Sequence, residues 1–329
     1  MTKSVMTATV EREQEGDHRQ MADALREALA ASPRAIPPLF FYDALGSALF
    51  DAICELPWYP VTRAETALLR AHAVDIGHIT TPARLVELGP GNGRKAALLA
   101  RGLRRPSLDV HLVDISAAAL SEAHATVGGV EGVRVTTHAT TYEAGLAAVR
   151  PPADGDGATL VAFLGSNIGN FDPRGACAFL GALRGEMREG DFLLVGADLV
   201  KPERELLLAY DDPLGVTAAF NKNVLARINR EFDADFDLDL FAHEARWQPR
   251  ESRVEMHLVS RQDQVVTIEQ VDLAFQLRAG ETIWTESSYK YEPDSIVGLV
   301  RGAGFAERAQ WIDPIRRFAL TLFSADSRR

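Results

Sequence analysis

The sequence predicts an α/β fold in which a doubly wound, mostly parallel sheet carries an inserted α+β lobe. Strand-like and helix-like patterns alternate from about Ala64 to Val200, and a glycine-rich turn at 89–93 joins one strand to the helix after it. After Lys201 the pattern changes to a helical region followed by alternating strand-like runs. A βαβ rhythm of this kind is typical of a parallel sheet with helices on both faces.

The strands of the sheet are predicted from short apolar runs, each followed by a helical pattern. They cover 84–88, 109–113, 133–137, 159–164 and 192–196, and the helices between them include 94–101 and 173–188. A helix at 294–302 and a strand at 317–323 are expected to complete the sheet. Ligands of such sheets bind beyond the carboxyl ends of the strands, so we expect the glycine turn, Asp114 and residues 165–170 to face one pocket.

The second region is predicted to be a separate lobe. Its helical part ends at Arg230, and strand-like runs follow at 241–247, 253–258 and 265–273. The charge content of the first twenty or so residues predicts a flexible start. We divide the chain into an N-terminal segment that joins the substrate-binding lobe (1–63), a cofactor-binding domain (64–200), the substrate-binding lobe itself (201–289) and C-terminal elements that complete the sheet (290–329).

Composition restricts the classes of partner. A chain of 329 residues, 47% of them hydrophobic, can bury a sizeable core. Its formal charge of −11 argues against nucleic acid, because phosphate binding needs a basic surface, and favours a small-molecule substrate. No apolar run reaches the length of a membrane span and the N-terminal segment is polar, so we expect no membrane partner and a cytoplasmic location. The oligomeric state is left open, a monomer included.

Cysteines and histidines show no metal-binding pattern. Cys54 and Cys177 do not form C-x-x-C, and no two of the eight histidines form H-x-x-x-H. We therefore predict no metal. Both cysteines lie in apolar stretches, which predicts small core side chains in a reducing compartment.

The glycine turn indicates the kind of cofactor. Its spacing is G-x-G-x-G, with Glu87 two residues before the first glycine. A nicotinamide enzyme is the alternative, but its usual spacing is G-x-G-x-x-G, and a carboxylate this close suits the amino group of a methionine moiety better than a pyrophosphate. Asp114 ends the next strand, where it could accept hydrogen bonds from both ribose hydroxyls. The arrangement resembles the Rossmann-like sheet of class I methyltransferases, which use S-adenosylmethionine.

Motifs outside the turn carry a narrower resemblance. They are FFYDALGSALFD from Phe40, LPWYPVTRAE from Leu56, FLGSNIGN from Phe163, AYDD from Ala209 and GVTAAFN from Gly215. Together they resemble the histidine Nα-methyltransferases that form hercynine, from about Pro37 to the C-terminus. The resemblance implies methylation of the α-amino group of L-histidine to N,N,N-trimethylhistidine, the first step of ergothioneine biosynthesis.

The resemblance also implies roles for individual residues. Asn170 and Tyr210 would hold the substrate carboxylate, and Glu286 would accept the imidazole N–H. Alternate residues of a strand share a face, so Glu286 and Ser288 could reach one ring. The implied catalytic residues are Tyr42 and Tyr59; the substrate-binding residues are Phe50, Tyr59, Gly165, Asn170, Tyr210, Met256, Glu286 and Ser288; and the cofactor-binding residues are Glu87, Gly89, Gly91, Gly93, Lys95, Asp114, Thr141 and Tyr142.

Each of these residue types also has an ordinary structural explanation. A strand glutamate usually faces solvent, and a buried methionine or tyrosine usually belongs to the core. Asp211 and Asp212 are more simply explained as a brace for the helical stretch that follows them. One departure from the family pattern is Thr141, where relatives usually carry an acid before the aromatic residue that contacts adenine; a hydroxyl offers only a weaker, neutral hydrogen bond there.

The expected reaction is an in-line displacement at the methyl carbon by the substrate amine, which requires mainly alignment of the reactants. Faces of Tyr42, Tyr59 or Phe50 could receive the methylammonium product through cation–π contact. Two alternatives stay open: an Nα-methyltransferase for another amino acid or an imidazole amine, and a non-catalytic partner protein that binds the cofactor.

Overall fold

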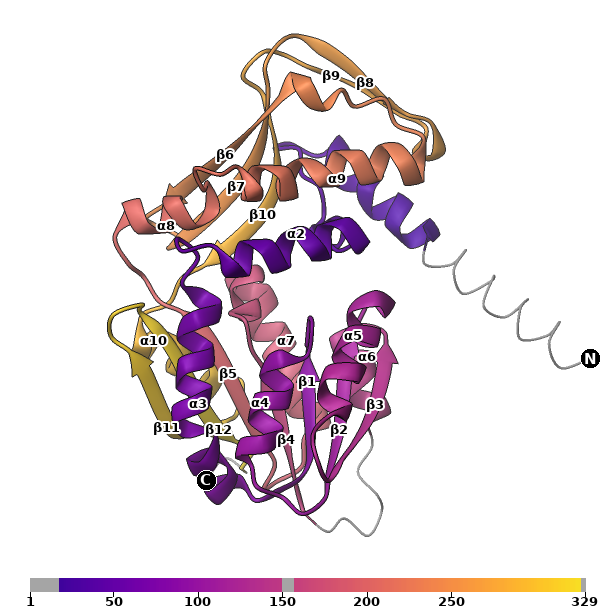
Figure 1. The fold of residues 1–329 in the computed structure, drawn as a ribbon. Helices are drawn as coiled ribbons and strands as arrows, with labels where there is room; N and C mark the ends of the chain where they lie inside the picture. The colour runs from indigo at the N-terminus through magenta and orange to yellow at the C-terminus, as the bar shows by residue number, and fades with distance from the viewer. Residues whose placement is uncertain (1–17, 150–156, 327–329) are drawn as a thin grey trace, which may run out of the picture. The chain divides into compact units, whose positions relative to one another are not determined.

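A computed structural model describes residues 18–149 and 157–326, which form two compact units (Figure 1). Of the described residues, unit one comprises 18–50, Tyr210–Arg246 and Glu255–Glu286, and unit two comprises the rest. The predicted flexible start lies mostly outside the described residues, and 18–30 are helical. Within the described residues, no helix is long and apolar enough to cross a membrane.

Unit two is built on a seven-stranded sheet with the strand order β11-β12-β5-β4-β1-β2-β3. Strands β1 to β5 run parallel to one another. Strand β12 pairs with β5 in antiparallel orientation, and β11 pairs with β12 in the same way. This confirms the predicted α/β class. The strands are β1 (Pro82–Leu88), β2 (Leu108–Asp114), β3 (Val133–Ala139), β4 (Ala158–Phe163), β5 (Phe192–Asp198), β11 (Ala306–Asp313) and β12 (Phe318–Ser324). Each predicted strand of this sheet is found within two residues of its expected bounds, while β11 was not predicted.

Helices cover both faces of this sheet (Figure 1). One layer is α3 (Val61–Thr80), α4 (Arg94–Gly102) and α5 (Ala117–Gly128), which pack on one another in sequence; the other is α6 (Tyr142–Ala148), α7 (Pro173–Glu186) and α10 (Pro293–Gly302). In α7 the buried residues Ala176, Phe179, Leu180 and Leu183 follow helical spacing. That stripe packs against strand residues such as Val161 in one continuous apolar core.

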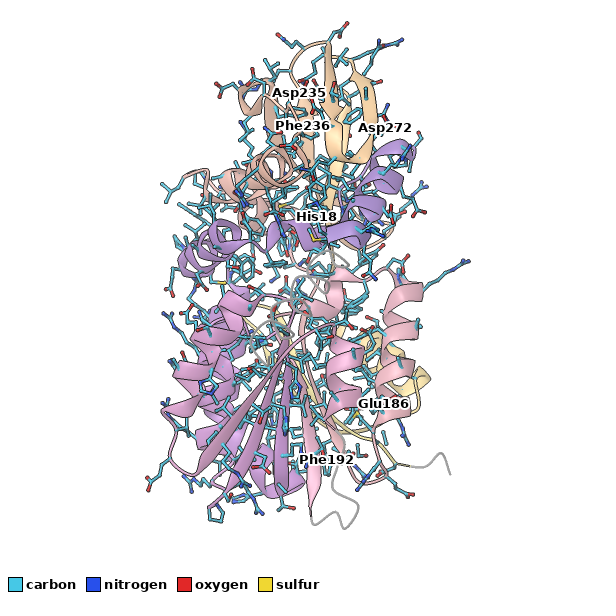
Figure 2. All side chains as sticks on the ribbon, turned by 90° about the vertical axis from the view of Figure 1, so that its right-hand side faces the viewer. His18, Glu186, Phe192, Asp235, Phe236 and Asp272 are labelled. Carbon is cyan, nitrogen blue, oxygen red and sulfur yellow. The ribbon has the colours of Figure 1, made fainter. Side chains whose placement is uncertain are left out.

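The strand order reverses between β1 and β4, which creates a topological switch point at the carboxyl ends of these strands. Glu186, the last residue of α7, and Phe192, the first of β5, mark the opposite, amino end of the sheet (Figure 2). The loops that follow Leu88, Asp114 and Phe163 therefore meet at the edge where a ligand is expected.

Unit one contains most of a three-stranded sheet in the order β10-β7-β6, a two-stranded sheet of β8 and β9, and helix α9. The elements outside the layers of unit two are η1 (Pro38–Phe41), α2 (Ala44–Glu55), η2 (Asn167–Asn170), α8 (Glu203–Tyr210), α9 (Val216–Phe232), η3 (Leu238–Leu240), β6 (Phe241–Gln248), β7 (Arg253–Ser260), β8 (Gln264–Ile268), η4 (Glu269–Val271), β9 (Leu273–Leu277) and β10 (Thr282–Tyr289). The runs predicted at 241–247 and 253–258 are confirmed as β6 and β7.

The single strand predicted at 265–273 is wrong. The chain turns through η4 and through Asp272, whose φ of 48° is left-handed, so that β8 and β9 pair as a hairpin. Asp235 and Phe236 attach this hairpin to the rest of unit one (Figure 2). The Asp235 carboxylate accepts the Thr267 N–H at 2.7 Å, and the Phe236 ring packs against Phe275 at 6.3 Å.

Two further expectations concern single side chains. The brace proposed for Asp212 is confirmed, because its carboxylate accepts the backbone N–H groups of Leu214, Val216 and Thr217 at the start of α9. The expectation that both cysteines are core residues is wrong for Cys177, which is exposed, and Cys54 is only partly buried. Cys177 lies on α7 between buried positions, and helical spacing turns it away from the apolar stripe.

Two helical glycines of unit two should respond oppositely to alanine. A Cβ at Gly145 in α6 would collide with the buried side chain of Val113, whereas one at Gly181 in α7 would meet nothing within 4 Å. We expect Gly145→Ala to destabilise the protein by about 1–3 kcal/mol through overpacking, and Gly181→Ala to stabilise it by about 0.5–1 kcal/mol through helix propensity. Thermal unfolding midpoints test this, and shifts of the same sign would contradict the packing described for α6.

Candidate active site

The glycine turn after β1 is shaped by close contacts that exclude side chains. Gly89 has a φ of 73°, and a Cβ there would lie 2.8 Å from both the Tyr142 hydroxyl and the Asn167 side-chain nitrogen. Gly93 precedes α4 with a φ of 76°, and a Cβ there would lie 2.7 Å from the backbone of Ala123. Glycine at these positions lets the turn approach the loops after β3 and β4, and the first amide of α4, that of Arg94, donates to the Asn92 side chain at 3.2 Å.

Glu87 points a buried carboxylate into this edge of the sheet. Its side chain is fully buried, and neither carboxylate oxygen has a hydrogen-bond partner among the described residues. Burial raises the pKa of Glu87 to about 8, although the Lys95 ammonium opposes the shift. A buried acid without a partner is costly for a fold to keep, and it fits a cationic group of a ligand.

A second buried acid, Glu65 on α3, binds the loop that follows β4. Its carboxylate accepts the Lys95 ammonium at 2.7 Å and the Gly165 N–H at 2.8 and 2.9 Å. Burial disfavours the charge of Lys95, but the carboxylates of Glu65 and Glu87 outweigh this effect and raise the Lys95 pKa. Lys95 is therefore held as a cation next to Gly165, where a Cβ would lie 3.2 Å from its Nζ.

Asp114 is the last residue of β2, and Tyr142 is the first residue of α6, which follows β3. The Asp114 carboxylate accepts the Ser116 N–H at 2.9 Å; burial raises its pKa, while bonds from backbone amides, Gly91 among them, lower it. Burial also raises the pKa of Tyr142, which stays a neutral phenol beside Gly89. Thr141 caps α6 by accepting the Ala144 N–H at 3.4 Å, so its oxygen has a structural use that accounts for a short polar residue here.

These residues form a set that suits S-adenosylmethionine. Glu87 would hold the amino group, Lys95 the carboxylate, Asp114 the ribose and Tyr142 the adenine. The Glu87 carboxyl group, which has no hydrogen-bond partner among the described residues, is the observation that tests this fit, because a ligand ammonium would donate to it and favour its ionised form. Among the residues that the structure describes, no three His, Cys, Asp or Glu side chains are grouped so as to hold a metal ion.

Four of the residues assigned to substrate lie in unit two. Tyr59 is buried and lies two residues before the start of α3. Gly165 lies two residues before the short helix η2, which follows β4, and Asn170 is the last residue of η2. Ser288 is buried near the end of β10, where its hydroxyl oxygen accepts the Lys290 ammonium at 2.7 Å. Gly165 is thus brought to the cofactor set through Glu65 and Lys95.

The remaining substrate candidates belong to unit one. The ring of Tyr42 meets Phe50 edge-on at 6.2 Å and Phe220 at 6.3 Å, so the structure brings the two predicted aromatics together and adds a third. Tyr210 and Met256 are buried, and Glu286 is half-buried in β10. Whether the substrate candidates of the two units act on one ligand stays a prediction.

Sequence reasoning missed Glu65. The signal for it was available, because Glu65 lies four residues after Val61 and four before Leu69, both on the buried face of α3. A charged residue at a position that helical spacing assigns to the core is unusual unless it is paired. Its partners, Lys95 and Gly165, are 30 and 100 residues away along the chain, so only the folded structure identifies them.

The sheet order and the family match together define a methyltransferase that depends on S-adenosylmethionine. Residues 21–325 match the family described as "Histidine-specific methyltransferase, SAM-dependent". The chain belongs to this family.

Named relatives agree with this assignment. The chain is 41% identical to a histidine N-alpha-methyltransferase of Mycolicibacterium smegmatis, with 91% of this chain and 92% of the relative covered. It is also 41% identical to that of Mycobacterium tuberculosis, with 94% and 96% covered. Ergothioneine biosynthesis protein 1 of Neurospora crassa is 28% identical over 77% of this chain and 31% of its own, longer length.

Cofactor binding should release a proton through Glu87. With a pKa of about 8, the free carboxyl is mostly protonated at pH 7, and an adjacent ammonium favours its ionised form. Titration with S-adenosylhomocysteine at pH 7 should therefore release about 0.9 proton, and affinity should rise as the pH is raised toward 8. Calorimetry in two buffers of different protonation enthalpy measures this number. Glu87→Gln is the control that should lose the release, and wild-type binding without proton release would remove Glu87 from the amino-group site.

Proposed function

We propose that this protein transfers methyl groups from S-adenosylmethionine to the α-amino group of L-histidine and forms hercynine, the first step of ergothioneine biosynthesis. The observation that carries the proposal is the buried, unpartnered Glu87 carboxylate beside the Lys95 cation, in a chain of the histidine-specific family. This pair matches the ammonium and carboxylate of an amino-acid moiety, which the cofactor carries. The histidine substrate is supported by the names of the two mycobacterial relatives.

The proposed roles of the chain's residues are binding and alignment. Bound S-adenosylmethionine supplies an activated methyl group as a sulfonium. Asn170 and Tyr210 donate to the substrate carboxylate, and Glu286 accepts the imidazole N–H, so that the amine is held in one position. Tyr42 and Tyr59 offer aromatic faces to the methylated amine. Histidine is the small-molecule partner, and we propose a cytoplasmic location, where histidine and S-adenosylmethionine are both available.

The function is tested by incubating the protein with S-adenosylmethionine and, separately, histidine, tryptophan, tyrosine and histamine. We expect the largest kcat/KM for histidine and a trimethylated product by mass spectrometry. A larger kcat/KM for another substrate would favour an Nα-methyltransferase of different specificity. Binding of S-adenosylhomocysteine without any methylated product would favour a non-catalytic cofactor-binding protein.

Glu286 should set the preference for histidine. If its carboxylate accepts the imidazole N–H, Glu286→Ala should lose on the order of 2 kcal/mol of transition-state stabilisation for histidine. Phenylalanine has no side-chain N–H to donate, so it should lose little, or gain from the space released. The measurement is the ratio of kcat/KM for histidine to that for phenylalanine.

Glu286→Gln is the matched control for this prediction, because it keeps the side-chain volume and one carbonyl acceptor but removes the charge. Its ratio should fall between those of wild type and Glu286→Ala. The same ratio in all three proteins would show that Glu286 does not contact the substrate side chain.

A further inference from the structure

Asn221 on α9 lies at the centre of a buried hydrogen-bond network in unit one. Its side chain is fully buried. Its amide nitrogen donates to the His257 carbonyl oxygen at 3.1 Å and faces His243 Nδ1 at 2.9 Å, and its amide oxygen accepts the Thr285 hydroxyl at 2.7 Å. One side chain of α9 thereby connects β6, β7 and β10.

The chemistry of these partners fixes the direction of every bond. A carbonyl oxygen can only accept, so the Asn221 nitrogen must face His257, and the same nitrogen then donates to His243 Nδ1. The proton of a neutral His243 is therefore on Nε2. This nitrogen lies 2.8 Å from the Tyr210 carbonyl oxygen, which again can only accept. Burial lowers the pKa of His243, which favours this neutral form, although the Tyr210 carbonyl and Asp211 oppose the shift.

The network ends at residues assigned to the substrate. Tyr210 is the last residue of α8, where backbone carbonyl groups commonly accept hydrogen bonds from outside the helix. The bond from His243 is of this kind and fixes the backbone that carries the Tyr210 phenol. At the other end, the Thr285 hydroxyl also lies 3.0 Å from the Met256 carbonyl oxygen, and Thr285 directly precedes Glu286.

We propose that His243 and Asn221 are positioning residues for the amino-acid substrate, and that they act through the backbone of Tyr210. The inference rests on the proposed function, in which Tyr210 holds the substrate carboxylate. Both residues belong to unit one, whereas the cofactor set belongs to unit two. Their loss therefore weakens the binding of histidine and leaves that of S-adenosylhomocysteine unchanged.

Two substitutions of His243 distinguish an effect of its hydrogen bond to Tyr210 from an effect of its side-chain volume. Glutamine can donate to the Tyr210 carbonyl through its amide nitrogen and accept from Asn221 through its oxygen, whereas leucine can do neither. We expect His243→Leu to raise the KM for histidine about tenfold with a smaller change in kcat, and His243→Gln to stay within about threefold of wild type. Calorimetry should give one dissociation constant for S-adenosylhomocysteine in all three proteins. Equal effects of leucine and glutamine would overturn the inference.

A double-mutant cycle tests whether His243 acts through Tyr210. Tyr210→Phe alone should raise the KM for histidine, and adding His243→Leu should then change KM by less than about twofold, because the phenol that His243 positions is already lost. The inference would be overturned if the effects of the two substitutions on the KM for histidine multiplied in the double variant. It would also be overturned if Tyr210→Phe left this KM unchanged. The proposed function fails separately, if the wild-type protein forms no methylated histidine.

Asn221→Ala and Asn229→Ala form a matched pair on α9. Asn229 also bonds to backbone, donating to the Phe236 carbonyl at 2.7 Å, but it does not lead to Tyr210. Both variants should be less stable, and only Asn221→Ala should raise the KM for histidine. Should His243→Leu fail to fold, Thr285→Val is nearly isosteric and removes one donor to Asn221; we expect it to raise KM about threefold, and no change would count against the network.

Discussion

The arrangement of residues at the carboxyl ends of β1 and β4, where we expect the cofactor, depends on the hydrogen bonds of the buried Glu65 carboxylate. This carboxylate joins helix α3 to helix α4 through Lys95, and to the turn after β4 through the Gly165 N–H. Strand β5 leaves room for it, because a Cβ at Gly196 would collide with the Glu65 carboxylate. A buried charge is tolerated only when it is paired, and removal of one partner typically costs about 3–5 kcal/mol. The positions of Lys95 and Gly165 therefore follow from Glu65.

The same pairing explains why Glu87 can stay without a partner. Near pH 7 the Glu65 carboxylate and the Lys95 ammonium cancel in charge, and Glu87, with a pKa of about 8, is mostly neutral. The site is then electrically balanced before any ligand binds. A ligand ammonium would favour the ionised form of Glu87 and would give its carboxylate a charge-assisted hydrogen bond. The site thus favours a ligand that carries an ammonium group by its charge.

Local patterns in the sequence were sufficient for much of this architecture. Apolar periodicity located the sheet strands from β1 to β5 within two residues, and the glycine spacing located the turn between β1 and α4, whose contact with the cofactor stays a prediction. Features that depend on partners distant in the chain were not predictable in this way: the Glu65 pair, and the network of Asn221 and His243. The hairpin of β8 and β9 was missed because Asp272 in a left-handed conformation interrupts an otherwise strand-like run. The role of Thr141 as a helix cap uses one acceptor of its hydroxyl oxygen, a use that the residue type alone does not reveal, and leaves the O–H free to donate.

The affinity of Glu65→Gln for S-adenosylhomocysteine shows whether the charge of Glu65 holds Lys95 and the loop after β4 in the arrangement that binds the cofactor. Glutamine keeps the shape and one acceptor for Gly165 but no longer neutralises Lys95. The control is Glu55→Gln, since Glu55 is an exposed acid that pairs weakly with Arg94 at 3.4 Å. We expect Glu65→Gln to weaken binding about tenfold or more, because a buried charge-assisted bond is lost, and Glu55→Gln to bind like wild type. Equal, wild-type affinities in both variants would contradict this role of Glu65.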